Sequence, residues 1–230
     1  MSPSRQISLD SVGVDLGGRR VLDDVSVTLD QRRIAVIGSN GSGKSTFARL
    51  LNGLVTANSG SVTVHGLDPA RDGTAVRRRV GFVFSNPDAQ IIMPTVAEDV
   101  AFSLRGRGLD RDSSAARVTA TLETFGLTTL AHHAAQSLSS GQKQLLALAA
   151  ILVAEPDLVI ADEPTALLDL VNARQISRHL LEEMSPQLVL VTHDLRLAAR
   201  CDIVLRFDEG RLADVGEPAR IIADYERTTA

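Results

Sequence analysis

Residues 38–45 have the types and spacing that bind phosphate groups. Their sequence, Gly-Ser-Asn-Gly-Ser-Gly-Lys-Ser, matches G-x-x-x-x-G-K-S in full and lies between an apolar run at 33–37 and a helical pattern at 46–54. Glycines let successive backbone N–H groups point at one concave site, and the following helix adds its positive end. Lys44 can neutralise the outer phosphates, and the Ser45 hydroxyl can bind Mg²⁺. The nucleotide-binding residues predicted here are Gly38, Ser39, Asn40, Gly41, Ser42, Gly43, Lys44, Ser45 and Thr46.

Two carboxylates, Asp162 and Glu163, follow the apolar run 158–161. In open α/β sheets, ligands bind beyond the carboxyl ends of the strands, so this position suits a metal ion and a water molecule. Asp162 is predicted to hold Mg²⁺ through water, and Glu163 to orient or deprotonate the attacking water. Apolar runs that end in Asp-Glu are also common strand exits, and it is the phosphate loop that favours the catalytic interpretation.

The elements that position these residues alternate along the chain. Apolar runs at 33–37, 158–161 and 188–191 predict buried strands. Further strands are predicted at 25–29, 61–65 and 80–84, helices at 46–54, 96–104, 115–125, 141–153 and 171–184, and a hairpin at 203–215. This order predicts an α/β fold with a mostly parallel sheet covered by helices.

Length and composition indicate a single folded domain. The chain has 230 residues, 44% of them hydrophobic, and its net charge of −4 gives no support for nucleic acid as a partner. Its one cysteine, Cys201, cannot form an intrachain disulfide. No stretch approaches the roughly 18 to 20 apolar residues of a membrane span. We expect a soluble domain in which residues 88–150 form a helical insertion between parts at 1–87 and 151–230.

The segment Leu-Ser-Ser-Gly-Gln at 138–142 resembles the signature of ATP-binding cassette (ABC) proteins. The resemblance extends to 165–169 and to Thr-His-Asp at 192–194, in the family's order and over nearly the whole chain. It implies a P-loop NTPase of the ABC ATPase fold, with a mixed sheet core, an N-terminal antiparallel β part and a helical subdomain. It also implies ATP and Mg²⁺ as cofactors.

In this family two cassettes sandwich two ATP molecules head to tail, which makes a second ATPase subunit, in a homodimer, an expected partner. From the residues alone, 139–142 begin a helix whose N–H groups suit an anion, although an ordinary serine-capped helix fits better. The other motifs favour the anion site. The resemblance implies that His193 contacts the γ-phosphate and holds the attacking water, and that Asp169 joins the two active sites. It assigns the capping of the partner's ATP to Ser139, Ser140, Gly141 and Gln142.

Three positions depart from the family's pattern. The loop expected at 12–18 lacks the aromatic ring that usually stacks on adenine, which leaves Arg19 or Arg20 to cover the base. Ser85 stands where the family has a glutamine that reaches Mg²⁺ and the attacking water, and a serine is too short for that. Leu167 replaces a usual glycine in the loop that precedes Asp169.

The segments Asn-Pro-Asp-Ala-Gln at 86–90 and Glu-Asp-Val-Ala-Phe at 98–102 resemble ATPases of energy-coupling-factor (ECF) importers of vitamins and transition metals. Ser85 and Leu167 are similar to the ATPase of the biotin-transporting member. The resemblance implies a peripheral position on the cytoplasmic face of the membrane, with a transmembrane coupling subunit and a membrane substrate-binding subunit as partners. Ser85 and Gln90 would belong to the coupling loop, while the apolar residues at 91–93 either line its groove or pack inside.

Other functions share these motifs. A cobalt or nickel ECF importer and a soluble cassette ATPase, such as one of iron–sulfur cluster assembly, are the main alternatives, and the segment 86–90 disfavours the second. A translation or DNA-repair cassette protein is disfavoured by the single cassette without a long coiled-coil insertion. A non-catalytic nucleotide-binding module would lack Lys44 or Glu163, and both are present.

Overall fold

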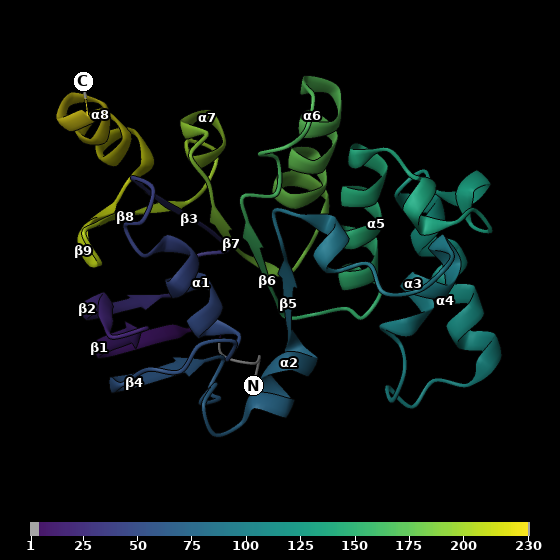
Figure 1. Cartoon of the computed structure of the whole chain (residues 1–230), viewed down its shortest axis with the longest axis horizontal. Helices are drawn as coiled ribbons and strands as arrows, with labels where there is room; N and C mark the ends of the chain where they lie inside the picture. The colour runs from purple at the N-terminus through teal and green to yellow at the C-terminus, as the bar shows by residue number, and fades with distance from the viewer. Residues whose placement is uncertain (1–4, 230) are drawn as a thin grey trace. The chain divides into compact units, whose positions relative to one another are not determined.

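The computed structural model describes residues 5–229, which form two compact units (Figure 1). The sheet unit runs up to Gly81 and resumes with Asp157–Glu163 and from Met184 onward. The helical unit comprises Phe82–Pro156 and Pro164–Glu183. The subdomain boundaries expected from the sequence, at 88 and 150, stay a prediction.

The sheet unit begins with an antiparallel sheet of order β2-β1-β4. Its strands are β1 (Ile7–Leu16), β2 (Arg19–Leu29) and β4 (Ser59–Val64). Ile7 and Leu9 are buried on one face of β1, as the two-residue period of a strand requires. The loop expected at 12–18 is wrong, because β1 continues as a strand through Leu16. Leu16 pairs with Arg19, so only the tight turn Gly17-Gly18 connects β1 to β2.

A second sheet contains six strands in the order β5-β6-β7-β3-β8-β9. They are β3 (Arg33–Gly38), β5 (Val80–Val83), β6 (Leu158–Asp162), β7 (Gln187–Val191), β8 (Ile203–Asp208) and β9 (Arg211–Gly216). Strands β6, β7, β3 and β8 are parallel, and β9 returns antiparallel to β8. All residues of β6 and β7 are buried. The predicted α/β fold, with a mixed sheet and an antiparallel N-terminal part, is confirmed.

Within residues 5–229, four helices complete the sheet unit: α1 (Lys44–Leu51), α2 (Gly73–Arg79), α7 (Leu195–Ala198) and α8 (Pro218–Thr229). The helix expected at 46–54 is α1, which begins earlier and ends earlier because Gly53, at a φ of +75°, turns the chain away. No helix was expected at the positions of α2, α7 and α8, which are short or have their apolar residues among arginines.

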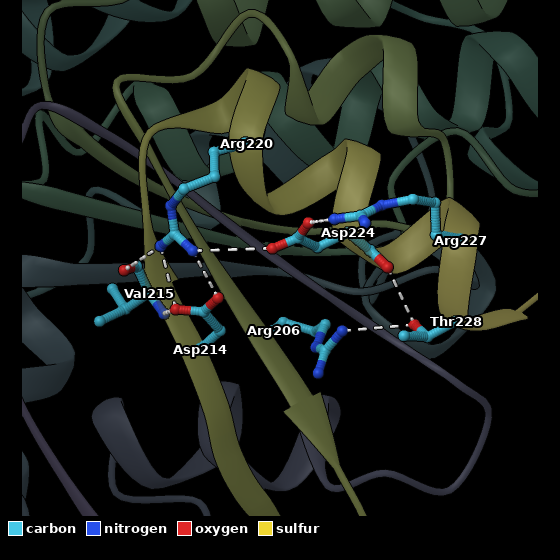
Figure 2. A network of polar contacts seen from close by, with 7 residues as sticks. All are labelled: Arg206, Asp214, Val215, Arg220, Asp224, Arg227 and Thr228. Atoms are coloured by element: carbon cyan, nitrogen blue, oxygen red, sulfur yellow. Dashed lines mark hydrogen bonds and ion pairs between the residues drawn. The ribbon is translucent and has the colours of Figure 1, made fainter.

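Helix α8 is held on β8 and β9 by the buried Ile221 and by a network of polar contacts (Figure 2). Arg220 donates to both carboxylate oxygens of Asp214, at 2.7 and 3.0 Å, and to the carbonyl of Val215 at 3.1 Å. Figure 2 shows the rest of the network, in which Asp224 contacts Arg220 and Arg227, and Arg206 donates to Thr228. These contacts fix the end of the described chain against the edge strand of the sheet.

The helical unit contains α3 (Val96–Phe102), α4 (Arg111–Thr124), α5 (Ser140–Leu152) and α6 (Leu170–Arg178), which continues as a π-helical turn, His179–Glu183. Short 3₁₀ turns lie at Pro87–Ala89, Thr128–Leu130 and Ala135–Ser137. Figure 1 shows α3, α4 and α5 packed together. The predicted capping box of Thr95 and Glu98 is confirmed. The helix expected from 115 begins at Arg111, because Asp110 accepts a hydrogen bond from Ser113 N at 2.8 Å and caps it.

Candidate nucleotide-binding and catalytic site

The phosphate loop joins the end of β3 to the first turn of α1. Gly38, Gly41 and Gly43 have φ angles of +145°, +79° and +101°, which other residues rarely adopt. A Cβ on Gly38 would lie 2.2 Å from the carbonyl oxygen of Phe207, and one on Gly43 would lie 2.7 Å from Leu22 Cδ2. No side chain caps α1, so its first N–H groups stay available to an anion in the loop.

Lys44 is buried inside this loop, with 7% of its surface exposed. Its Nζ donates to the carbonyl oxygens of Gly38 and Ser39, each at 2.8 Å. Burial lowers the pKa of the Lys44 ammonium, and the nearby carboxylates of Glu163 and Asp162 oppose that effect. The ammonium therefore holds the loop in shape and places a positive charge where phosphate oxygens would bind.

Ser45 and Asp162 meet beside the loop, with Ser45 Oγ donating to Asp162 Oδ1 at 2.9 Å. Asp162 is 5% exposed, and burial raises the pKa of its carboxyl, against the hydrogen bond from Ser45 and the charges of Arg49 and Lys44. Within residues 5–229 no three or more His, Cys, Asp or Glu side chains gather as a metal site. One hydroxyl and one carboxylate are the oxygen donors that fit Mg²⁺, which keeps waters and binds mainly through phosphates.

Glu163 leaves the end of β6 in the left-handed region, with a φ of +53°, and its N–H donates to the carbonyl of Val191 at 3.0 Å. This turn directs its carboxylate toward the next loop, where its Oε2 lies 2.8 Å from Nδ1 of His193. Thr192 anchors that loop, because its N–H donates to Val36 O on β3 and its hydroxyl accepts from Asp194 N. The predicted residues of the sheet unit therefore come together at the carboxyl ends of the neighbouring strands β3, β6 and β7.

The signature segment forms the start of α5 in the helical unit. Ser139 Oγ accepts from Gln142 N at 3.3 Å, and Gln142 Oε1 accepts from Ser139 N at 2.9 Å. The serine-capped helix that the sequence left open is therefore present, as a full capping box. Asp169 caps α6 in the same unit by accepting from Val171 N and Asn172 N, both at 2.9 Å. Hydrogen bonds from the backbone and the side chain of Asn172 hold the pKa of Asp169 below its usual value.

Ser85 and Gln90 belong to a segment that is tied to α5 by side-chain amides. Gln90 Oε1 accepts from Phe84 N at 3.3 Å, and Gln90 Nε2 donates to Ala147 O at 3.0 Å. Gln144 Nε2 donates to Phe84 O at 3.2 Å. Phe84 lies one residue beyond β5, so the two glutamines supply the partners that a neighbouring strand would give.

A charged contact adds to this tie. Lys143 Nζ lies 2.7 Å from Asp88 Oδ1, so three residues of α5, at 143, 144 and 147, face the segment 84–90. Of the apolar residues at 91–93, Ile91 is buried while Ile92 is 68% exposed. Asp99 Oδ1 accepts from the backbone N–H of Ile92 and of Met93, and thereby fixes that turn.

The predicted site residues thus fall into two groups, each assembled within one unit. The sheet unit brings together the loop 38–46, Asp162, Glu163 and His193, and the helical unit contains Ser85, Gln90, 139–142 and Asp169. Sequence reasoning missed Asn172, which donates to Asp169, and Gln144, which donates to the carbonyl of Phe84 next to Ser85. A polar residue within a helical pattern gives no signal of such a contact.

Comparisons with known proteins agree with this geometry. The family model described as ABC transporter matches residues 22–166. The biotin transport ATP-binding protein BioM of Rhizobium etli is 43% identical, over 97% of this chain and 99% of that protein. The energy-coupling factor transporter ATP-binding protein EcfA1 of Latilactobacillus sakei is 40% identical, over 91% of this chain and 76% of that protein. An ABC transporter ATP-binding protein of Bartonella quintana, whose name gives no substrate, is 45% identical over 96% of this chain and 97% of that protein.

Solved structures support the same conclusion. CbiO1 of Clostridium perfringens, described as part of the ABC transporter complex CbiONQ, superimposes with a TM-score of 0.85 at 31% identity, covering 96% of this chain and 91% of that one. No helix within residues 5–229 has both the length and the apolar character that crossing a bilayer requires. The chain therefore belongs to the ABC transporter family, as the ATP-hydrolysing subunit of an ABC transporter of the ECF type.

Proposed function

We propose that this chain energises the import of a vitamin, biotin, as the peripheral ATPase of an ECF-type importer on the cytoplasmic face of the membrane. The observation that carries the substrate is the 43% identity to BioM of Rhizobium etli over nearly the full length of both chains. The BioM of Rhodobacter capsulatus, at 39% identity over 95% of this chain and 93% of that protein, supports the same substrate. Ser85 and Leu167, the two departures that resemble the biotin-transporting member, add to this proposal.

The geometry of the sheet unit supports the following roles for its residues. The loop 38–46 binds the phosphates, with Lys44 facing the outer two. Ser45 and Asp162 hold Mg²⁺, which when bound neutralises charge that develops on the phosphates. Glu163 takes a proton from the attacking water. His193, whose Nδ1 contacts Oε2 of Glu163, keeps Glu163 and the water in place.

The helical-unit residues act on a second copy of the chain. Ser139, Ser140, Gly141 and Gln142 cap ATP bound by the partner subunit, and Asp169 joins the two sites. A dimeric cassette of 26% identity, solved with ADP and Pi, superimposes with a TM-score of 0.80 over 92% of this chain and 98% of that one, and supports this arrangement. ATP binding closes the dimer because it adds contacts that only the closed state makes. The segment Ser85–Gln90 receives the transmembrane coupling subunit, which works with a membrane substrate-binding subunit.

Affinity purification of the tagged chain from membranes tests the proposal. We expect two membrane proteins to copurify, and biotin to be released when the purified complex is denatured. Recovery of a transition metal in place of biotin would indicate a cobalt or nickel ECF importer. Recovery of the chain without membrane proteins would favour a soluble assembly ATPase.

A further inference from the structure

Gly141, in the first turn of α5, lies against the side chain of Asn172 on α6. A Cβ built on Gly141 would lie 2.2 Å from Asn172 Cγ, 2.4 Å from its Oδ1 and 2.5 Å from its Nδ2. These separations are far inside van der Waals contact. Even an alanine at 141 therefore requires the Asn172 amide to move.

The backbone of Gly141 gives no separate reason for a glycine. It is a helical residue and is absent from the glycines at positive φ. Glycine in a helix costs about 1 kcal/mol relative to alanine. What this position requires is space, and Asn172 is what occupies it.

Asn172 is not free to turn away, because its amide is bonded to Asp169. Its Nδ2 donates to Asp169 Oδ2 at 2.8 Å, while its backbone N–H donates to Asp169 Oδ1 at 2.9 Å. Displacing the Asn172 amide therefore breaks the bond that orients the second carboxylate oxygen of Asp169. A contact on α5 is in this way linked to the cap of α6.

We propose that Asn172 is a positioning residue which links the signature turn at Gly141 to Asp169 within one chain, and that Gly141 is a glycine because Asn172 packs against it. This inference rests on the proposed roles of 139–142 and of Asp169. It adds that the two groups respond together: a shift of the signature turn moves the Asn172 amide and with it the Asp169 carboxylate.

Steady-state hydrolysis by four purified proteins tests the link: wild type, Gly141→Ala, Asn172→Ala and the double variant. Gly141→Ala should lower kcat by on the order of tenfold to a hundredfold, because the displaced amide misplaces Asp169. Asn172→Ala removes the side chain that the new Cβ would strike, so kcat of the double variant should be within about threefold of that of Asn172→Ala alone.

Gly73→Ala is the matched control. Gly73 begins α2, and its added Cβ would meet only the flexible end of Arg77, at 2.9 Å.

A double variant as slow as Gly141→Ala would overturn the inference, because the glycine would then be needed by something other than Asn172, such as the partner's nucleotide. Two readouts do not depend on ATPase activity. The melting temperature should fall in Gly141→Ala and recover in the double variant, and failure to recover would also overturn the inference. The pKa of Asp169, followed by carboxyl NMR, should rise in Asn172→Ala, and an unchanged value would contradict the link. If the wild-type protein itself hydrolysed no ATP, the proposed function would be contradicted instead.

Discussion

His193 and Glu163 meet through a single oxygen. Oε2 of Glu163 lies 2.8 Å from the ring Nδ1 of His193 and 3.4 Å from its backbone N. Glu163 reaches this position only with a φ of +53°, a conformation that costs a non-glycine residue about 1–3 kcal/mol. Ser11, Asp24, His65, Glu155 and Glu209 also have positive φ angles, so it is the contact with His193 that marks Glu163 as the candidate base.

Glu163→Gln should abolish turnover and keep ATP binding. The amide has the size of the carboxylate but cannot accept a proton from water, so phosphate release should fall by at least about a hundredfold. Nucleotide affinity, measured by titration, should stay near wild type, and ATP should leave closed dimers detectable by size-exclusion chromatography. Glu155→Gln is the control, because Glu155 also has a positive φ, +50°, and its side chain is 72% exposed. Unchanged hydrolysis in Glu163→Gln would contradict the assignment of the base.

ATP and GTP should be hydrolysed at comparable rates. The tip of the β1–β2 hairpin presents no aromatic ring, and Leu16 there is 44% exposed. Arg20 is engaged by Asp15 at 3.3 Å and by Asp23 at 3.4 Å, whereas Arg19 forms no ion pair among the described residues. Arg19 is therefore the better candidate to cover the base, and a guanidinium plane stacks on either purine.

The measurement for this prediction is kcat/KM for both nucleotides with the purified complex. Arg19→Ala should weaken both by a similar factor, on the order of threefold to tenfold, and Arg20→Ala should weaken them less. A strong preference of the wild type for ATP would contradict the prediction, because another group would then distinguish adenine from guanine.

The parts of the molecule that the sequence predicts are those in which local pattern and tertiary role agree. The strand β6 and the loop 38–45 are examples, because a buried strand needs an apolar run and a phosphate cradle needs glycines at fixed spacing. Helix α8 was not predicted because, among its residues whose burial is described (218–228), only Ile221 is buried, and its polar contacts with β9 have no sequence pattern. The contact of Asn172 with Gly141 escaped for the same reason, since it exists only once α5 and α6 are packed.

Lowering the pH should destabilise the helical unit through His179. This residue is 3% exposed, stacks on Phe125 with ring centroids 4.5 Å apart, and places Nδ1 2.5 Å from Glu183, which also pairs with Arg178. Burial lowers the pKa of the His179 imidazole, and the charge of Arg178 acts in the same direction, while Glu183 opposes both. Its other ring nitrogen, Nε2, is buried without a hydrogen-bond partner, so a proton there would be unpaired.

Because the pKa in the folded state lies below that in the unfolded state, the unfolded chain binds the extra proton first as the pH falls. The contribution is fully present above the unfolded pKa of about 6.5 and is lost as the pH drops below it. Urea denaturation at several pH values from 7.5 to 5 should show a falling free energy of unfolding. His179→Phe should flatten that part of the curve, and His132→Gln, at an exposed histidine, should not. A curve that His179→Phe leaves unchanged would assign the pH dependence elsewhere.

Gln144→Leu should destabilise the protein by about 1–3 kcal/mol, since it leaves the part-buried carbonyl of Phe84 without its partner. Gln144 is 1% exposed, so water cannot easily replace the amide, and leucine has nearly the same volume, so the loss is of the hydrogen bond and not of packing. Urea denaturation measures the change, with the exposed Gln136→Leu as the control. Because Gln90 holds the N–H of the same residue, Gln90→Leu should also destabilise, and the double variant should cost less than the sum of the two. If the losses of unfolding free energy in the two single variants simply added up in the double variant, Gln144 and Gln90 would hold the segment 84–90 independently of each other.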